Sequence, residues 1–145
     1  MKTRREPNGI WVVSLERGDD LRSCVEKLAL DEGIDGGRVT AIGGVEDPEL
    51  GCYELSTKSY LRKAFDGIHE LVSLDGNLTV KDGKPYLHAH VVISGADFVA
   101  YAGHLFDCKI GLVAEMFIDP LSAPLTRLPC EDIGLARWEP LAVKQ

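Results

Sequence analysis

Most apolar segments of this chain have the composition and length of β-strands. Residues 10–15 (IWVVSL) are β-branched, aromatic and apolar, which favours a strand that ends before Gly18. Segments of similar character are residues 39–42, 50–54, 68–74, 78–80, 87–93 and 110–118. Asp82 and Gly83 are typical of a tight hairpin turn. Because strands joined by short turns pair antiparallel, the pattern predicts a mainly antiparallel sheet.

One segment instead has the spacing of an amphipathic helix. Its apolar positions recur every three or four residues, at Leu21, Cys24, Val25, Leu28 and Ala29. Asp19 or Asp20 can cap the N-terminus, and Gly33 can end the helix. We interpret the apolar face as part of the core. One helix among many strands, without regular alternation, predicts an α+β fold.

Several segments are expected to interrupt the strands. Gly43 and Gly44 would close the strand at 39–42, and a phosphate-binding loop is the alternative, although no GxGxxG or GK[ST] pattern is present. Residues 56–65 are expected to form a turn or short helix, and residues 75–77 a turn. Three prolines after residue 118 disfavour long elements, so we expect a single domain over 1–145, with a core at about 10–118 and an irregular arm at 119–145 anchored by Leu135 and Trp138.

The charge balance argues against direct DNA binding. The 145 residues carry a formal net charge of -7, whereas nucleic-acid binders present basic surfaces. The one basic cluster, Lys2, Arg4 and Arg5, is followed at once by Glu6 and is expected to be a flexible end. The four cysteines lack CxxC spacing, which suggests free thiols in a reducing compartment. With no long apolar run and no secretory signal, we expect a cytoplasmic protein that does not enter a membrane.

Three of the four histidines lie close together in the sequence. Because strand residues two apart share a face, His88 and His90 should project side by side. His104 follows on the next segment and could complete a three-nitrogen ligand set with an open fourth position, which suits zinc. The alternative is that these are ordinary strand histidines satisfied by their neighbours. His69 is expected to be a surface or interface residue.

Glu70 is the most interesting carboxylate, because it lies inside an apolar segment. It could accept a hydrogen bond from a ligand histidine, or act as general base on metal-bound water. It could equally be an edge or interface residue that pairs with a Lys or Arg. Glu115 is similar with less support, and Asp75 and Asn77 are interpreted as turn residues.

Several motifs together are similar to a known family. They are RGDDL at 17–21, IGGV at 42–45, ELVSLDGN at 70–77, LHAHVV at 87–92 and GHL at 103–105, followed by Glu115. In this combination the chain resembles the PPC domain (plants and prokaryotes conserved), which in plants accompanies AT-hook DNA-binding motifs. The resemblance spans about residues 11–118, with further similarity around Arg127.

The resemblance implies a compact α+β fold, a homotrimer and, as in several stand-alone prokaryotic members, a metal held by histidines. Carried over to this chain, the ligands are His88, His90 and His104. Ala102 replaces the family's usual glycine, and its methyl group would tighten the turn that presents His104. The AT-hook core, Arg-Gly-Arg-Pro, is absent. The family's association with DNA therefore does not transfer directly to this chain.

Two functions follow from these observations. The first is a trimeric metal-binding module for assembly, for a small-molecule ligand or for a protein partner, with a DNA-linked or regulatory role by family association. The second is a zinc-dependent hydrolase or lyase that uses the three histidines, with Glu70 as the base. Three imidazoles favour zinc, although nickel or copper accepts the same ligands.

Overall fold

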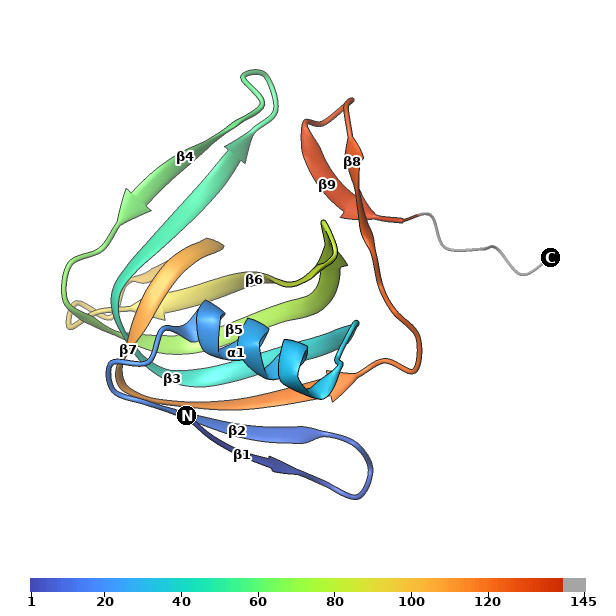
Figure 1. Ribbon diagram of the computed structural model, residues 1–145. Coiled ribbons are helices and arrows are strands. Elements are labelled where there is room, and N and C mark those ends of the chain that lie inside the picture. The colour runs from blue at the N-terminus through green and yellow to red at the C-terminus, as the bar shows by residue number, and fades with distance from the viewer. Residues whose placement is uncertain (140–145) are drawn as a thin grey trace.

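The structure, a computed structural model, describes residues 1–139. Strands dominate it, and a single helix lies against them (Figure 1). The elements are β1 (Lys2–Arg5), β2 (Trp11–Glu16), α1 (Leu21–Glu32), β3 (Gly37–Glu54), β4 (Ser59–Ala64), β5 (Ile68–Lys81), β6 (Lys84–Ser94), β7 (Ala100–Pro120), β8 (Arg127–Cys130) and β9 (Leu135–Trp138). The expected α+β fold is confirmed. In these residues no helix is long and apolar enough to cross a membrane.

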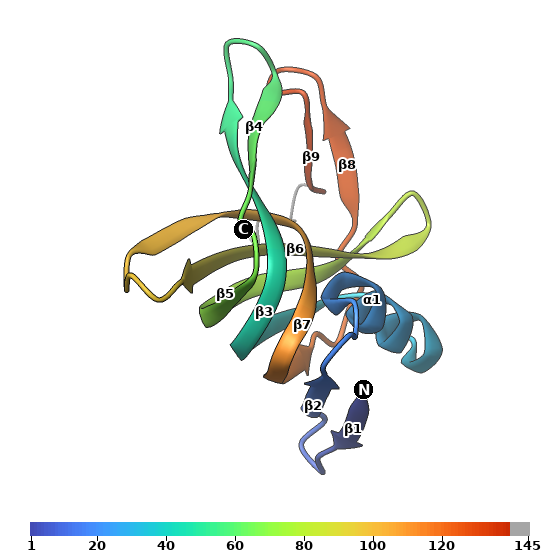
Figure 2. The ribbon, with the colours of Figure 1, turned by 90° about the vertical axis from the view of Figure 1, so that its left-hand side faces the viewer.

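The main sheet has seven strands in the order β1-β2-β7-β6-β5-β3-β4, and every strand pairing is antiparallel. Strands β3 and β7 also pair with each other along most of their length. This extra pairing closes β3, β5, β6 and β7 into a ring, which Figure 2 shows from the side. The core fills this ring, and its largest fully buried side chains come from α1 and from strands β2, β5, β6 and β7.

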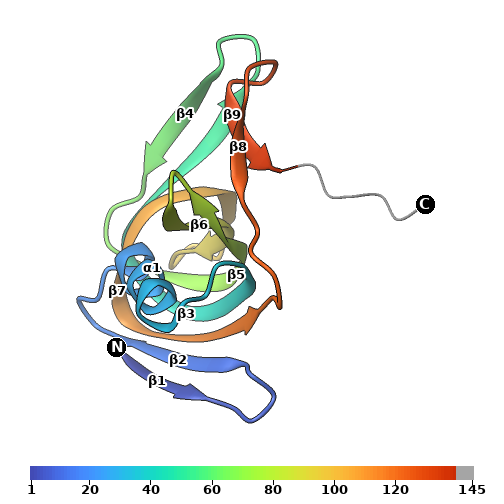
Figure 3. The same cartoon turned by 45° about the vertical axis from the view of Figure 1, so that its right-hand side comes forward.

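The helix begins and ends where the sequence predicts. Asp20 caps it, accepting a 2.7 Å hydrogen bond from the backbone N–H of Ser23, and Gly33 ends it with a left-handed φ of 66°. The apolar positions Leu21, Val25 and Leu28 are buried as expected. Figure 3 shows α1 lying across one end of the ring.

Several predicted strand ends are wrong, because the strands are longer than their apolar segments. Gly43 and Gly44 lie inside β3, next to a bulge, and form no phosphate loop. A Cβ atom on Gly43 would collide with the carbonyl oxygen of Val113, so glycine allows β3 and β7 to approach closely. Residues 75–77 likewise continue β5 without a turn. A Cβ atom on Gly76 would lie 2.6 Å from the carbonyl oxygen of His88.

Three segments expected to be irregular form strands instead. The second half of residues 56–65 is β4, which pairs with the end of β3. The basic N-terminus is β1, where Lys2 pairs with Glu16 and Arg4 with Glu6, so partners neutralise two of its charges. The C-terminal arm contains the β8–β9 hairpin, with Pro129 inside β8, and residues 140–145 of that arm lie outside the described residues. The tight turn at Asp82 and Gly83 is confirmed, with positive φ at both residues.

Candidate metal centre

The structure brings His88, His90 and His104 together on two adjacent strands. Each offers one ring nitrogen, and these nitrogens all lie within 4.8 Å of one another. The ring centroid of His88 lies 5.3 Å from that of His90 and 5.1 Å from that of His104. His90 and His104 are directly opposed in the β6–β7 pairing, with centroids 5.6 Å apart. The cluster is one of the sites expected from the sequence.

Strand alternation explains how β6 presents two of these rings. Leu87, Ala89 and Val91 are buried in the core, so the intervening His88 and His90 point to the opposite face. His104 reaches the same place from the first part of β7, which is continuous strand there. The turn expected before His104 is therefore absent, and Ala102 is an exposed strand residue opposite Val92.

Burial keeps two of the three rings neutral. His104 is 6% exposed, and desolvation, with the neighbouring His90 next, lowers its pKa to about 4. Desolvation, followed by the nearby charge of Arg127, lowers the pKa of His88 to about 4 as well. At neutral pH both imidazoles therefore carry a nitrogen lone pair, which is the form that binds a metal.

A second observation indicates that these residues fit a divalent metal ion. Nδ1 of His104 is buried and has no hydrogen-bond partner in residues 1–139, although buried polar atoms are almost always paired. Two nitrogens bound to one tetrahedral zinc ion lie roughly 3.3 Å apart. The nitrogens in the structure, all within 4.8 Å of one another, exceed this spacing by at most about 1.5 Å, a difference that side-chain rotations can close. Three imidazoles are a common ligand set for zinc.

Arg127 is the residue whose role the sequence did not predict. It is the first residue of β8 and is 8% exposed. Its guanidinium donates to Thr79 Oγ1 at 3.1 Å, to Asn77 Oδ1 at 2.9 Å, to the Ala136 carbonyl oxygen at 3.0 Å and to His88 Nδ1 at 2.8 Å. The hairpin is therefore fastened to β5 beside the histidines. The family similarity around Arg127 was the one signal that could have drawn attention to it.

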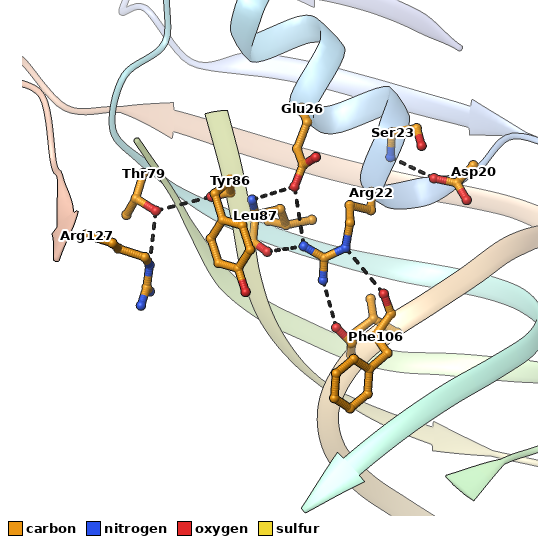
Figure 4. Close-up of polar contacts among 10 residues, drawn as sticks. Asp20, Arg22, Ser23, Glu26, Thr79, Tyr86, Leu87, Phe106 and Arg127 are labelled. Atoms are coloured by element: carbon orange, nitrogen blue, oxygen red, sulfur yellow. Dashed lines mark hydrogen bonds and ion pairs between the residues drawn. The ribbon is translucent and has the colours of Figure 1, made fainter. Parts of the chain in front are cut away.

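A second arginine fixes the other side of the site (Figure 4). Arg22 of α1 donates to the carbonyl oxygens of Leu87 at 2.5 Å, Leu105 at 2.9 Å and Phe106 at 3.3 Å. Each of the first two acceptors is the chain neighbour of a cluster histidine. Glu26 accepts from the N–H of Leu87 at 3.0 Å and from Arg22 at 3.3 Å. The helix thus holds the two histidine-bearing strands in a fixed relation.

Glu70 does not reach the histidines within this chain. Its partner across the β5–β6 pairing is Ser94, whereas the partner of His88 is Asn77. The six-residue offset along the strand corresponds to about 20 Å. Glu70 is also exposed in the single chain, which agrees with the alternative of an edge or interface residue. Together with Glu115 it borders an exposed apolar area on the far part of the sheet.

The remaining candidates have structural explanations. Asp75, opposite His90 on β5, pairs with Arg38 at 3.4 Å on the exposed surface. Asn77 accepts from Arg127, so it orients a neighbour of His88. The ring of His69 lies edge-on to Phe65, away from the cluster. All four cysteines are free, and burial raises the pKa of the Cys108 thiol to about 12.

The comparisons with known proteins identify the family. The chain belongs to the Plants and Prokaryotes Conserved (PCC, or PPC) domain family, whose family model matches residues 3–122. The predicted resemblance is therefore confirmed. No match was found among curated proteins.

Three solved structures illustrate the similarity. A PPC protein from Pyrococcus horikoshii is 27% identical, with a TM-score of 0.85 and coverage of 98% of this chain and 96% of that one. A metal-containing protein from Archaeoglobus fulgidus is 33% identical, with a TM-score of 0.86 and coverage of 97% and 100%. A proposed DNA-binding protein from Bacteroides thetaiotaomicron is 25% identical, with a TM-score of 0.90 and coverage of 95% and 96%.

Proposed function

We propose that this protein is a metal-binding module that holds a divalent ion, zinc in the first instance, through His88, His90 and His104. The observation that carries the proposal is the cluster of His88, His90 and His104, each offering one ring nitrogen within 4.8 Å of the others, and the buried, unpaired Nδ1 of His104 supports it. The description of the Archaeoglobus relative as metal-containing supports it. With three protein ligands, a bound ion would keep an open position and act as a Lewis acid toward a small ligand.

A binding module agrees better with this site than a hydrolase does. A metal-dependent hydrolase needs a general base within hydrogen-bond reach of the attacking water. Within residues 1–139 no acidic side chain joins the histidine cluster or lines the cavity beside it. Because Glu70 lies about 13 Å along the strand from His90, the nearest histidine of the cluster, and about 20 Å from His88, it cannot serve as the base in the same chain. We therefore favour binding of a ligand or partner over catalysis.

We further propose that the module is a homotrimer, as the family resemblance implies. Large apolar side chains are exposed on strands β3, β5 and β7 and in the turn between β6 and β7. They are Ile42, Val72, Leu112, Val113 and Phe117, with Phe98 in the turn. Phe98 is 91% exposed and has a φ of 59°, an uncommon conformation for a bulky residue. An apolar patch of this kind usually marks an interface between proteins.

The assembly can be tested by light scattering. A charge at the centre of the patch, as in Leu112→Asp, should convert trimers to monomers, because a buried unpaired carboxylate is costly. Leu30→Asp is the matched control, since Leu30 is 68% exposed on α1, away from the patch. Monomers in the unsubstituted protein would contradict the trimer.

The location of the protein and its relation to DNA are further parts of the proposal. The proposed DNA-binding role belongs to the Bacteroides relative. This chain carries a net charge of -7, and its basic β1 strand is partly neutralised by Glu16 and Glu6. We therefore propose a cytoplasmic protein whose ligand is not duplex DNA. A salt titration against duplex DNA tests this, and binding at low salt would contradict it.

The metal site is tested by cobalt(II) substitution, because cobalt reports its coordination through visible absorption. We expect the unsubstituted protein to develop intense bands of a four- or five-coordinate ion. His104→Gln should lose them, while His69→Gln, outside the cluster, should retain them. Equal spectra in the two variants would contradict the proposal.

A further inference from the structure

A small cavity lies against the histidine cluster, beneath the β8–β9 hairpin. Its volume is about 200 Å³. Six of the residues that line it bear polar side chains: Tyr60, Lys81, Tyr86, His88, His104 and Arg127. The chain as a whole is acidic, yet no acidic side chain of the described residues lines this cavity. Its charge is therefore opposite to that of the molecule.

Arg127 is a buried cation without a counter-ion. It is 8% exposed, and all four of its hydrogen-bond partners, on Thr79, Asn77, Ala136 and His88, are neutral groups. It forms no ion pair with any side chain in residues 1–139. Buried charges are normally paired, because neutral partners do not replace the lost hydration. A negatively charged ligand would supply the counter-ion that Arg127 lacks.

A second cation lies on the same side of the cavity. The Lys81 ammonium is 5.0 Å from the ring centroid of Tyr86, and the Arg127 guanidinium carbon is 5.6 Å from it. Lys81 also has no ion pair among the described residues. Arg22 lies 5.5 Å from the same ring, but Glu26 balances its charge. Figure 4 shows Tyr86 between Arg127 and Arg22.

The walls between these cations and the histidines are aromatic. Tyr60 and Tyr86 line the cavity, and neither hydroxyl is hydrogen-bonded within residues 1–139. The Tyr60 ring lies 5.1 Å from that of His104 and 4.9 Å from that of Phe106. No glycine lines the cavity, so it lacks the glycine-rich backbone that cradles phosphate groups. Cations beside aromatic rings suit an organic acid better than a phosphate.

We propose that this cavity binds a small organic carboxylate, with the carboxylate on Arg127 and Lys81 and the apolar body against Tyr60, Tyr86 and Phe106. The inference deepens the proposed function and rests on it in one respect, since the ligand would lie beside the histidine cluster. It names the class of ligand that the metal-binding module recognises. Arg127 would both hold the β8–β9 hairpin against β5 and bind the carboxylate of the ligand.

Benzoate and benzamide test the proposal, because they share a shape and differ in charge. Calorimetric titration should show benzoate binding at least about tenfold more tightly than benzamide, in both zinc-loaded and chelator-treated protein. Inorganic phosphate is the third probe and should bind more weakly than benzoate. Equal binding of benzoate and benzamide, or tighter binding of phosphate, would overturn the assignment.

Two variants connect the binding to the residues. Arg127→Met and Lys81→Met should each lose at least about tenfold in benzoate affinity, while Lys84→Met, an exposed lysine at the start of β6, should not. If Arg127→Met does not fold, Lys81→Met decides, and unchanged affinity in that variant overturns the proposal. Benzoate binding without zinc binding would refute the metal site alone, whereas zinc binding without benzoate binding would refute the carboxylate alone.

Discussion

Arg127 Nη2 lies 2.8 Å from Nδ1 of His88, so a buried guanidinium donates a hydrogen bond to a ring of the candidate metal centre. Because arginine can only donate, Nδ1 must be the acceptor, and the neutral ring carries its proton on Nε2. In this state the one ring lone pair of His88, on Nδ1, is occupied by the hydrogen bond from Arg127. Ligation by His88 therefore requires this hydrogen bond to break, and the guanidinium then has one more donor for a ligand.

Removal of Arg127 should consequently strengthen metal binding. Arg127→Met eliminates both the competing hydrogen bond and a positive charge next to a divalent cation. We expect zinc affinity, measured by competition with a chromophoric chelator, to rise about tenfold. The same variant should lose affinity for benzoate, and a purely structural arginine would not produce opposite effects on the two ligands. Weaker zinc binding in a folded Arg127→Met protein would contradict this account.

The metal-free protein should lose stability as the pH falls from 6.5 towards 4. The pKa values of His88 and His104 are about 4 in the folded chain, below the ordinary value of 6.5. Between these limits the unfolded chain binds more protons, so the free energy of unfolding decreases with falling pH. With allowance for partial exposure, the loss is about 1–3 kcal/mol for each histidine.

Urea unfolding at pH 7 and pH 5, with a chelator present, measures this effect. The double variant His88→Gln/His104→Gln should lose much less stability between the two pH values than the unsubstituted protein. His69→Gln serves as the control and should behave like the unsubstituted protein. An equal loss in the double variant would show that these two histidines are not the groups responsible.

Arg22 should be far more important for stability than other charged residues of α1. Arg22→Met removes three hydrogen bonds to carbonyl oxygens of β6 and β7 and leaves Glu26 without its cation. We expect a loss of about 2–4 kcal/mol in denaturant unfolding. Lys27→Met breaks an exposed pair with Asp31 on the same helix and should cost at most about 0.5 kcal/mol. Similar losses in both variants would contradict the anchoring role of Arg22.

The fold class and the helix could be predicted because they depend on local patterns. The spacing of Leu21, Val25 and Leu28 and the caps at Asp20 and Gly33 are encoded within one segment. The alternation around His88 and His90 is equally local, so their shared face could be inferred. His104 could be suggested from its nearness in the sequence and from the family resemblance, but its position directly opposite His90 depends on the β6–β7 register, which the sequence does not reveal.

Features set by tertiary contacts could not be predicted in the same way. Glycine is typical of turns and strand ends, but Gly43 and Gly76 lie inside strands, where they permit close approach of the neighbouring strands. Glu70 has apolar sequence neighbours, yet its face of β5 is exposed in the single chain. Arg127 follows a proline-rich segment that gives no periodic signal. Its role depends on a hairpin that folds back over β5, a contact about 50 residues distant in sequence.

The central claim is that His88, His90 and His104 hold one divalent ion per chain, and the zinc content of purified protein after zinc loading and gel filtration tests it most directly. His90 is exposed, so His90→Ala should leave the fold intact while removing one ligand. The account predicts one zinc ion per chain in the unsubstituted protein and in His69→Ala, and a loss of most of the zinc in His90→Ala. No zinc in the unsubstituted protein, or the same zinc content in folded His90→Ala, would contradict it.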